Sequence, residues 1–317
     1  MCQNLGGIDT FKNINIPQGK VRSFQKDDIL LSNIRLYFRK VYRAKQKGGC
    51  SSDVLVFRAK HIDSATLFAI LSSQIFTDYA CSGSQGSKMP RGNKTHMMDF
   101  KIPTINFTIA KIFNSIQNKI ENNHKINELL HTLAYKIYEY YFKYKPKNAK
   151  LEQIIIENPK SSIMVKNAQK TQDKYPFFTS GDNILSYPKA IIDGRNCFLN
   201  TGGNAGIKFY VGKASYSTHT WCICANEFSD YLYLLLSSIK NHINQSFFQG
   251  TSLKHLRKNL LKKYPIYMPS AHEIKKFNQI IMPLLTLISI NTRTSKKLEQ
   301  IRDFLLPLLL KQQVKPQ

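Results

Sequence analysis

The chain has 317 residues, with 46 Lys and Arg against 20 Asp and Glu, a formal net charge of +26 and a sequence pI near 9.8. Hydrophobic residues make up 42% and aromatic residues 11%, which provides apolar cores for one or two domains and excludes a disordered basic tail. The charge favours a polyanionic partner. Nucleic acid fits better than a membrane, since no apolar run approaches the roughly 20 residues that span a bilayer; a peripheral lipid contact stays open as the lesser alternative.

The N-terminal sequence and the cysteines both point to an intracellular protein. The first twenty residues lack the apolar region of a secretory signal, so we expect a cytoplasmic protein with no membrane partner. Six cysteines are scattered, and only Cys222 and Cys224 lie close together, as a C-x-C pair. Zinc sites usually combine two pairs of Cys or His. We therefore expect reduced, mostly buried thiols and no metal.

Residues 1–103 contain short apolar runs bounded by turn residues, a pattern typical of a mixed domain. The run 35–42 predicts a strand with arginines on one face and apolar residues mostly on the other. The forked guanidinium of arginine suits phosphates and base edges, so Arg35, Arg39 and Arg43 are candidate DNA contacts. A solvated strand face without a ligand is the alternative.

Two basic clusters combine glycine, small hydroxyls and cations, QGSKMPRGNK at 85–94 and QGTSLKHLRK at 249–258. Exposed backbone N–H groups together with such side chains make a phosphate-binding surface. Occurrence in both halves favours function, although a duplicated structural turn would recur in the same way. The candidate phosphate contacts in the two clusters are Lys88, Arg91, Lys94, Lys254, Arg257 and Lys258.

Two long segments, 104–144 and 271–311, show apolar residues at heptad spacing, which predicts two coiled-coil helices. Pro283 and Pro307 in the second segment predict a bend and a frayed end. Both seams are polar at mid-length. The predicted seam residues are Ile109, Ile116, Lys119, Asn123, Leu130 and Ile137 in the first helix and Phe277, Leu284, Asn291, Ser295, Leu298 and Leu305 in the second.

An antiparallel pairing of these helices with full overlap places Lys119 opposite Ser295 and Asn123 opposite Asn291. Buried polar groups prefer polar partners to apolar walls, so the antiparallel register is favoured over a parallel one. Each helix would be about 60 Å long at 1.5 Å per residue. Two core helices without a spacer role are the alternative.

Residues 145–270 repeat the mixed pattern, and Lys208 and Lys213 add to the candidate DNA contacts. A Walker A loop at Gly206 is excluded, because five residues separate it from the next glycine and Ala214 occupies the Ser/Thr position. The sequence also lacks H-E-x-x-H and any convincing carboxylate cluster for metal-dependent cleavage. We therefore expect no catalytic site and no cofactor in this chain.

The two halves of the chain are similar to one another. FAILSS at 68–73 matches YLLLSS at 233–238, 165 residues later, and the two basic clusters are 164 residues apart. In both halves the cluster is followed by an extended segment, a proline and then a long helical pattern. A nearly constant offset indicates a duplicated unit, which is a mixed domain followed by a long helix.

Short segments at 48–56, 86–91, 175–181, 201–206, 212–213 and 300–309 follow one another in a particular order and are spread over most of the chain. In this order they resemble the specificity (S) subunit of type I restriction-modification systems. The resemblance implies an α+β fold in which two mixed target-recognition domains, the first truncated, are separated by two long antiparallel coiled-coil helices. The implied divisions are the partial first recognition domain 1–103, spacer helix 104–144, second recognition domain 145–270, spacer helix 271–311 and tail 312–317.

The resemblance also implies a function in bacterial defence. Such a chain would be a non-catalytic DNA sequence-specificity subunit that reads a bipartite double-stranded target and docks two methyltransferase (M) subunits and the restriction (R) subunits. S-adenosylmethionine, Mg and ATP would belong to those partners. The short first domain suggests self-association with another copy. The alternative is a basic coiled-coil scaffold that binds RNA or an acidic protein without DNA sequence specificity; a standalone nuclease is disfavoured.

Overall fold

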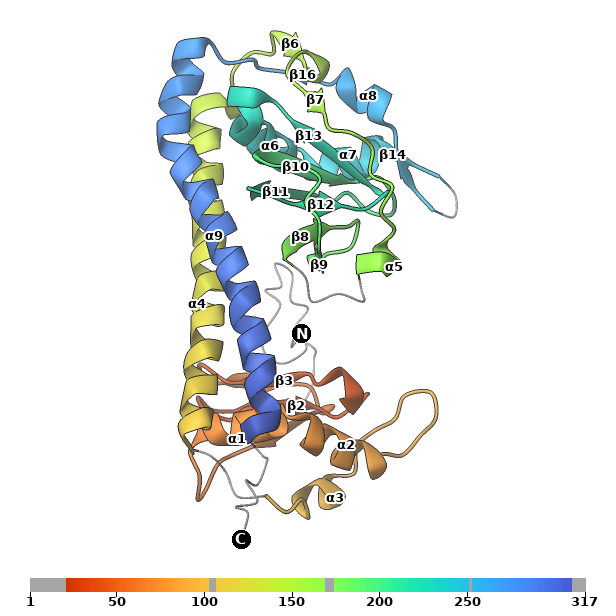
Figure 1. Cartoon of the computed structure of the whole chain (residues 1–317), viewed down its shortest axis with the longest axis vertical. Coiled ribbons are helices and arrows are strands. Elements are labelled where there is room, and N and C mark those ends of the chain that lie inside the picture. The colour runs from red at the N-terminus through yellow and green to blue at the C-terminus, as the bar shows by residue number, and fades with distance from the viewer. Residues whose placement is uncertain (1–20, 103–106, 169–173, 251–252, 310–317) are drawn as a thin grey trace. The chain divides into compact units, whose positions relative to one another are not determined.

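The computed structural model describes residues 21–102, 107–168, 174–250 and 253–309. The predicted tail 312–317 and the ends of the predicted spacer helices at 104–106 and 310–311 lie outside these residues. The chain forms two compact units: unit 1 comprises Met1–Asn123 and Thr294–Gln317, and unit 2 comprises His124–Arg293. Both units combine helices and strands, which confirms the predicted α+β class (Figure 1).

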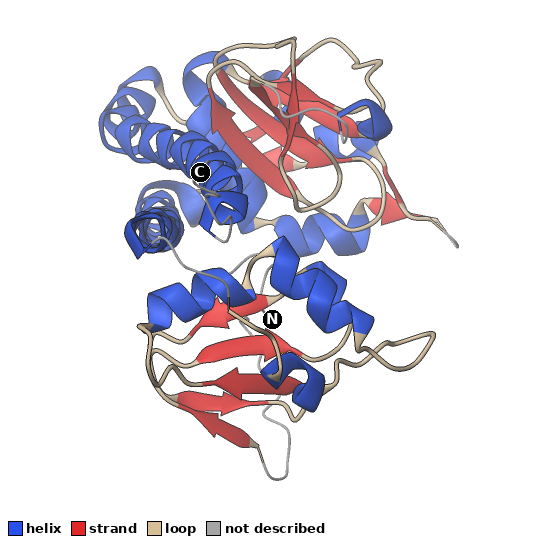
Figure 2. Cartoon of the chain, turned by 60° about the horizontal axis from the view of Figure 1, so that its bottom comes forward, coloured by secondary structure: helices blue, strands red, loops and turns tan. Residues whose placement is uncertain are grey.

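Unit 1 is built on an antiparallel three-stranded sheet in the order β3-β2-β5. Its strands are β2 (Ile29–Ser32), β3 (Val41–Arg43) and β5 (Val54–Phe57), and a separate pair joins β1 (Arg22–Phe24) to β4 (Gly48–Cys50). Short helices complete the unit: η1 (Leu36–Phe38), α1 (Ser64–Leu71), α2 (Gln74–Ser82) and α3 (Lys94–Met98). Figure 2 shows the strands and helices of this part of the chain.

The core of unit 1 lies between the sheet and helices α1 and α2, where Ile29, Phe68 and Phe76 are at most 2% exposed. Each of these helices begins after a polar residue whose side chain accepts a hydrogen bond from a free backbone N–H group of the first turn. The Asp63 carboxylate accepts from Thr66 N, and Ser73 Oγ accepts from Phe76 N. The caps set where α1 and α2 begin, and their apolar residues then face the sheet.

Unit 2 contains a four-stranded sheet in the order β11-β10-β13-β7 and a three-stranded sheet in the order β12-β8-β9. The strands are β6 (Ala149–Lys150), β7 (Ile156–Glu157), β8 (Tyr175–Phe178), β9 (Leu185–Tyr187), β10 (Arg195–Asn200), β11 (Ile207–Val211), β12 (Ser215–Tyr216), β13 (Thr220–Cys224), β14 (Phe248–Gln249), β15 (His255–Leu256) and β16 (Pro265–Ile266). The helices are η3 (Leu151–Gln153), α5 (Val165–Ala168), η4 (Asn226–Phe228), α6 (Ser229–Ser238), α7 (Lys240–Ser246) and α8 (Lys258–Lys262).

The core of unit 2 is dominated by β10, β13 and the almost wholly buried helix α6. A smaller aromatic cluster lies between the two sheets, where the rings of Phe178 and Phe198 stack with centroids 4.0 Å apart. Successive side chains of a strand point to opposite faces, so β10 contributes to both the main core and the aromatic cluster. Cys197 and Leu199 belong to the main core, while Phe198 belongs to the aromatic cluster. The strand is therefore buried on both faces.

Two long helices run antiparallel, as predicted: α4 (Phe107–Tyr138), which continues into the π-helical turn η2 (Glu139–Lys143), and α9 (Ala271–Leu309). Polar pairs join them within each unit. In unit 1, Asn123 Nδ2 donates to Ser295 Oγ over 3.1 Å; in unit 2, Asn291 Nδ2 donates to Asn127 Oδ1 over 3.0 Å. The polar positions thus meet, but one helical turn away from the predicted register, which placed Ser295 opposite Lys119. Lys119 is exposed.

The buried face of α4 lies one residue beyond the predicted seam. Its buried positions are Ala110, Phe113, Gln117, Ile120, Asn123, Ala134 and Tyr138. Of the predicted α4 seam, Asn123 is buried, Lys119 is exposed, and Ile109, Ile116, Leu130 and Ile137 are half-buried. Of the predicted α9 seam, Phe277 and Ser295 are buried, and Leu284, Asn291, Leu298 and Leu305 are half-buried.

The prolines of α9 do not interrupt it. The helix continues through Pro283 and Pro307, and both side chains are exposed. Proline removes one backbone hydrogen bond from a helix, and on the solvent side water satisfies the carbonyl that is left free. None of the helices in the described ranges combines the length and hydropathy that a bilayer-spanning segment needs.

The predicted duplication is visible in the sheet registers. In unit 1, Leu31 pairs with Val41 and Ser32 with Val54. The corresponding pairs of unit 2, 166 to 168 residues later, are Leu199 with Ile207 and Asn200 with Thr220. Helices α1 and α6 carry the repeated FAILSS and YLLLSS segments. The sheet β3-β2-β5 is therefore the counterpart of β11-β10-β13.

Candidate nucleic-acid interface

Each unit presents a short cationic hairpin at the predicted basic cluster. In unit 1, Gln85 N donates to Arg91 O over 2.9 Å, and Arg91 N donates to Gln85 O over 2.8 Å. In unit 2, Gln249 of β14 pairs with His255 of β15 in the same antiparallel way. We call these the 85–91 hairpin and the 249–255 hairpin. They are the same element of the duplicated fold.

The 85–91 hairpin is fixed to the segment that follows β2. Gly92 N donates to Asn33 O over 3.1 Å, and Arg35 N donates to Pro90 O over 2.9 Å. Ile34 and Arg91 also form an isolated antiparallel bridge. Backbone groups therefore hold the hairpin, which leaves its side chains available for other contacts.

The 249–255 hairpin is fixed in the corresponding way to the segment that follows β10. Leu256 N donates to Thr201 O over 3.0 Å, and Gly203 N donates to Lys254 O over 2.9 Å. Gly203 has a φ of 79°, a left-handed conformation that glycine adopts at little cost. The glycine-rich stretch of the sequence thus has a structural role, because it lets the chain turn beneath the hairpin.

The cations of the 85–91 hairpin lie at the surface. Lys88 and Arg91 are exposed within the hairpin, and Lys94 is exposed in the first turn of α3, whose N-cap is Asn93. Arg91 Nη2 lies 3.0 Å from Asp53 Oδ1 in a solvent-exposed ion pair. Exposed ion pairs of this kind are weak, so Arg91 can exchange Asp53 for a phosphate at little cost.

The predicted strand at 35–42 is wrong. Residues 36–38 form the 3-10 turn η1, and the strand β3 begins only at Val41. Arg35 and Arg39 flank the turn with φ values of 51° and 47°, both left-handed. A strand places alternate side chains on one face, but two left-handed residues reverse the chain direction instead. The three arginines therefore do not share a strand face.

Arg43 is engaged inside unit 1. Its Nε and Nη2 donate to Asp27 Oδ1 over 3.0 and 2.7 Å, and its Nη1 donates to Asn114 Oδ1 of α4 over 2.5 Å. The side chain is 19% exposed. The structure therefore gives Arg43 a role in joining β3 to α4, which a sequence pattern of alternating arginines does not reveal.

The candidate cations of the 249–258 cluster differ in their surroundings. Lys254 is exposed, and Arg257 Nε donates to Gln249 Oε1 over 3.2 Å at the surface. Lys258 is half-buried, with Nζ 5.1 Å from the centroid of the Trp221 ring. Burial lowers the pKa of Lys258. Lys254 and Arg257 are thus more accessible to a phosphate than Lys258.

The remaining candidates, Lys208 and Lys213, are not equivalent either. Lys208 Nζ donates to Thr179 O over 2.7 Å and to Gly181 O over 2.5 Å, and burial lowers the pKa of Lys208. Lys208 therefore joins β11 to the end of β8. Lys213 is exposed and lines a shallow cavity together with Tyr175.

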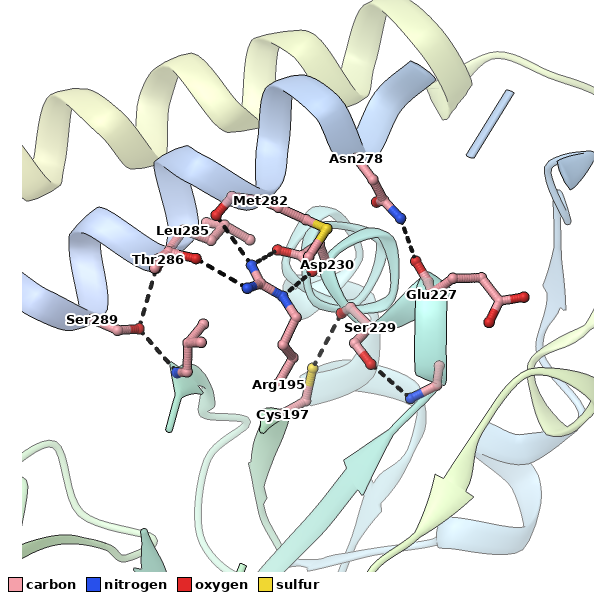
Figure 3. A network of polar contacts seen from close by, with 12 residues as sticks. Arg195, Cys197, Glu227, Ser229, Asp230, Asn278, Met282, Leu285, Thr286 and Ser289 are labelled. Atoms are coloured by element: carbon pink, nitrogen blue, oxygen red, sulfur yellow. Dashed lines mark hydrogen bonds and ion pairs between the residues drawn. The ribbon is translucent and has the colours of Figure 1, made fainter. Parts of the chain in front are cut away.

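A buried network joins the β10–β13 sheet of unit 2 to α9 (Figure 3). Arg195 at the start of β10 forms a two-pronged ion pair with Asp230 of α6, in which Nε donates to Oδ2 over 2.5 Å. Arg195 Nη1 also donates to Thr286 Oγ1 over 3.0 Å, and Nη2 donates to Met282 O over 3.2 Å. Burial raises the pKa of Asp230, and the Arg195 guanidinium opposes that shift.

Two further hydrogen bonds extend the same network along α9. Val211 N, at the end of β11, donates to Ser289 Oγ over 3.0 Å, and Asn278 Nδ2 donates to Glu227 O over 2.8 Å. Sequence reasoning missed these residues. The available signal was the single aspartate at position 230, at the start of the apolar run of α6. The network holds the sheet and α6 on one helix.

Of the cysteines that the structure describes, Cys197 and Cys222 are buried, whereas Cys50, Cys81 and Cys224 are half-buried, so the expectation of mostly buried thiols is met at only two positions. Burial raises the pKa of the Cys197 thiol and of the Cys222 thiol. Asn158 Nδ2 lies 3.3 Å from Cys222 Sγ. Over the described part of the chain, no three His, Cys, Asp or Glu residues gather as a possible metal site.

Residues 147–300 match the family model of the type I restriction modification DNA specificity domain. This region of the chain, just under half of it, is therefore similar to the specificity domain of type I restriction-modification systems. The matched residues run from β6 to β16 and include most of α9, together with the 249–255 hairpin and the Arg195 network. The resemblance inferred from the sequence is thereby confirmed.

Solved structures extend the comparison beyond the specificity domain. The S subunit of a type I restriction-modification system from M. genitalium aligns with a TM-score of 0.62 and 15% identity over 93% of this chain and 85% of that chain. The chain therefore has the fold of that S subunit. The HsdS subunit from Thermoanaerobacter tengcongensis aligns at 13% identity over 93% and 83% of the two chains, with a TM-score of 0.32. No curated protein sequence matches the chain.

A third structure comes from a study of complex assembly and conformational transition of the type I R-M system. It aligns at 13% identity over 94% of this chain and 85% of that chain, with a TM-score of 0.33.

Proposed function

We propose that the chain is the DNA sequence-specificity subunit of a type I restriction-modification complex and that each unit reads one half of a bipartite duplex target. The observation that carries the proposal is the duplicated framework: the hairpin within the specificity domain recurs in unit 1 with the same backbone hydrogen bonds. Two copies of one reading element match a target with two parts.

The chemistry of both hairpins supports a DNA ligand. Lys88 and Arg91 in unit 1, and Lys254 and Arg257 in or next to the hairpin of unit 2, are exposed cations on elements fixed by the backbone. Contacts to phosphates position a protein on the duplex, while side chains at base edges read the sequence. The net charge of +26 supplies long-range attraction to the same ligand.

We further propose that catalysis belongs to partner subunits in the cytoplasm, with two M subunits and the R subunits docked on the chain. S-adenosylmethionine, Mg and ATP would be bound by those partners, and the complex would act in bacterial defence. Exposed apolar residues on α4 support a docking role for the helix, namely Ile126, Leu129 and Leu133 at 41%, 62% and 49% exposure. Self-association with a second copy would use the same kind of surface.

Methylome sequencing tests the proposal. A bacterial host that lacks type I systems would express a cognate M subunit with or without this chain. We expect a new methylated motif of two short blocks separated by a spacer, present only when both proteins are made. A paired Lys254→Ala and Arg257→Ala variant should weaken methylation.

Unchanged methylation with and without the chain would contradict the proposal. Recovery of RNA or of an acidic protein in a pull-down, without a methyltransferase, would favour the scaffold alternative.

A further inference from the structure

The η1 turn of unit 1 carries two exposed aromatic rings. Tyr37 is 54% exposed and Phe38 is 40% exposed, although the preceding residue, Leu36, is only 4% exposed. The two rings lie with centroids 4.6 Å apart and planes at 56° to one another. Large aromatic side chains that stay in water beside a buried anchor indicate a contact surface.

The backbone on both sides of these rings is in an unfavourable conformation. Arg35 and Arg39 both have positive φ, which costs a non-glycine residue roughly 1 kcal/mol or more. At the position equivalent to Arg35, unit 2 has Gly203, which carries the corresponding hydrogen bond to its own hairpin. Unit 1 therefore retains arginine where glycine would serve the fold. Such residues concentrate at functional sites.

Cationic residues flank the rings in the sequence, at Arg35, Arg39 and Lys40. Lys40 Nζ lies 5.9 Å from the centroid of the Phe38 ring. Arg35 Nη2 lies 3.5 Å from Lys88 O of the 85–91 hairpin, and Arg35 Nε is buried without a hydrogen-bond partner. The only carboxylate among the described contacts of this turn and hairpin is Asp53, paired with Arg91. A protein ligand that lacks acidic groups would not complement these cations. A polyanion with flat apolar groups would complement both the cations and the rings.

We propose that the η1 turn is a base-stacking contact, in which Tyr37 and Phe38 pack against a partly unstacked base step of duplex DNA while Arg35, Arg39 and Lys40 bind the flanking phosphates. Aromatic and apolar side chains that insert at a base step bend the duplex and add contact area. The inference rests on the proposed function and assigns unit 1 a contact that unit 2 does not share, since the corresponding segment 201–206 contains no aromatic residue.

Photo-cross-linking and affinity measurements on the full chain test this inference. The probe is a pool of random-sequence duplexes with 5-iodouracil in place of thymine, which cross-links efficiently to stacked aromatic side chains. We expect cross-links in the tryptic peptide 36–39. The paired variant Tyr37→Ala and Phe38→Ala should lower the affinity about 5- to 100-fold. The dependence of affinity on salt should stay unchanged, because stacking displaces no counterions.

Two control variants separate stacking from loss of folding. The paired variant Tyr37→Phe and Phe38→Tyr keeps both rings and should bind like the wild type. Tyr140→Ala removes a tyrosine that is 86% exposed on η2, in unit 2, and should also leave the affinity unchanged.

The outcomes distinguish this inference from the proposed function. If the wild type binds the pool while the alanine pair binds equally well and 36–39 gives no cross-link, the stacking contact is overturned and the proposed function stands. Unchanged DNA affinity with loss of methyltransferase recovery would make the turn a protein contact, which also overturns it. A wild type that binds no DNA would overturn both.

Discussion

Asn123 on α4 donates a hydrogen bond to Ser295 on α9, and both side chains are buried, at 2% and 3% exposure. The pair favours the observed register of the helices in unit 1, because a shift by one turn would separate Asn123 from Ser295. A buried polar group that loses its partner is costly, whereas replacing both partners by apolar groups is nearly neutral.

Asn123→Ala should therefore lower the free energy of unfolding by about 1–3 kcal/mol, since Ser295 Oγ is left buried. Chemical denaturation monitored by circular dichroism measures the change. The neighbouring Asn122 is exposed, and Asn122→Ala should change stability by less than about 0.5 kcal/mol. Equal effects of the two variants would show that the buried pair does not stabilise the helices.

Arg195→Met should destabilise the protein by about 3–5 kcal/mol, because it leaves the buried carboxylate of Asp230 without its partner. A second change, Asp230→Asn, should restore much of the loss. Arg257→Met, which removes an exposed arginine, is the matched control and should leave stability nearly unchanged.

The effect of Arg195→Met should depend on pH. Burial already raises the pKa of Asp230 above its ordinary 3.8, and removing the guanidinium should raise it further. A carboxyl whose pKa is raised on folding holds its proton more tightly in the folded state, so stability is lost as pH rises above the unfolded value. The variant should therefore be least destabilised near about pH 4 and most near about pH 7. A pH-independent difference would argue against an unpaired buried carboxylate.

The cations of the hairpins should act on DNA affinity rather than on folding. Lys88→Ala and Lys254→Ala should each weaken binding to all sequences and reduce the slope of log affinity against log salt by about one. Lys208→Met is the contrasting variant, since Lys208 Nζ is bonded to Thr179 O and Gly181 O. It should lower the denaturation midpoint and leave the salt slope unchanged. Fluorescence anisotropy over a salt series separates the two effects.

Arg39→Gly should weaken DNA binding without destabilising the fold. The left-handed conformation at position 39 suits glycine, so the variant should unfold with a free energy equal to the wild type or up to about 1 kcal/mol higher. DNA affinity should fall, because the guanidinium beside the η1 turn is lost. A variant that gains stability and keeps its affinity would show that Arg39 is not part of the interface.

Much of the fold was predictable because the duplication leaves a constant offset in the sequence. The offset located the α1/α6 segments and both basic clusters without any structural information. The seam of α4 was misplaced by one residue because large apolar side chains, such as Ile112 and Leu133, lie on the exposed face at 45% and 49% exposure. The true seam includes Ala110 and Ala134, whose small side chains carry little weight in a hydrophobic pattern.

The candidate site was predictable only in part. Glycine-flanked cations identified the hairpins, since that composition is typical of a backbone-held anion surface. The turn at Arg35 and Arg39 was not predictable, because nothing in an arginine indicates a left-handed backbone. Arg195 and Arg43 were equally hidden, since their roles depend on Asp230 and Asp27, which lie elsewhere in the sequence.

The division of α9 between the units has a consequence for biosynthesis. Unit 1 takes its last helical segment from beyond residue 293, and Leu306 of that segment is 4% exposed within the core that contains Phe68. Unit 2 is contiguous in the chain and can fold on the ribosome as soon as it emerges. Unit 1 is synthesised first, but its core can close only after Leu306 has been translated, so a stop codon between residues 293 and 306 would damage the half that was translated earliest.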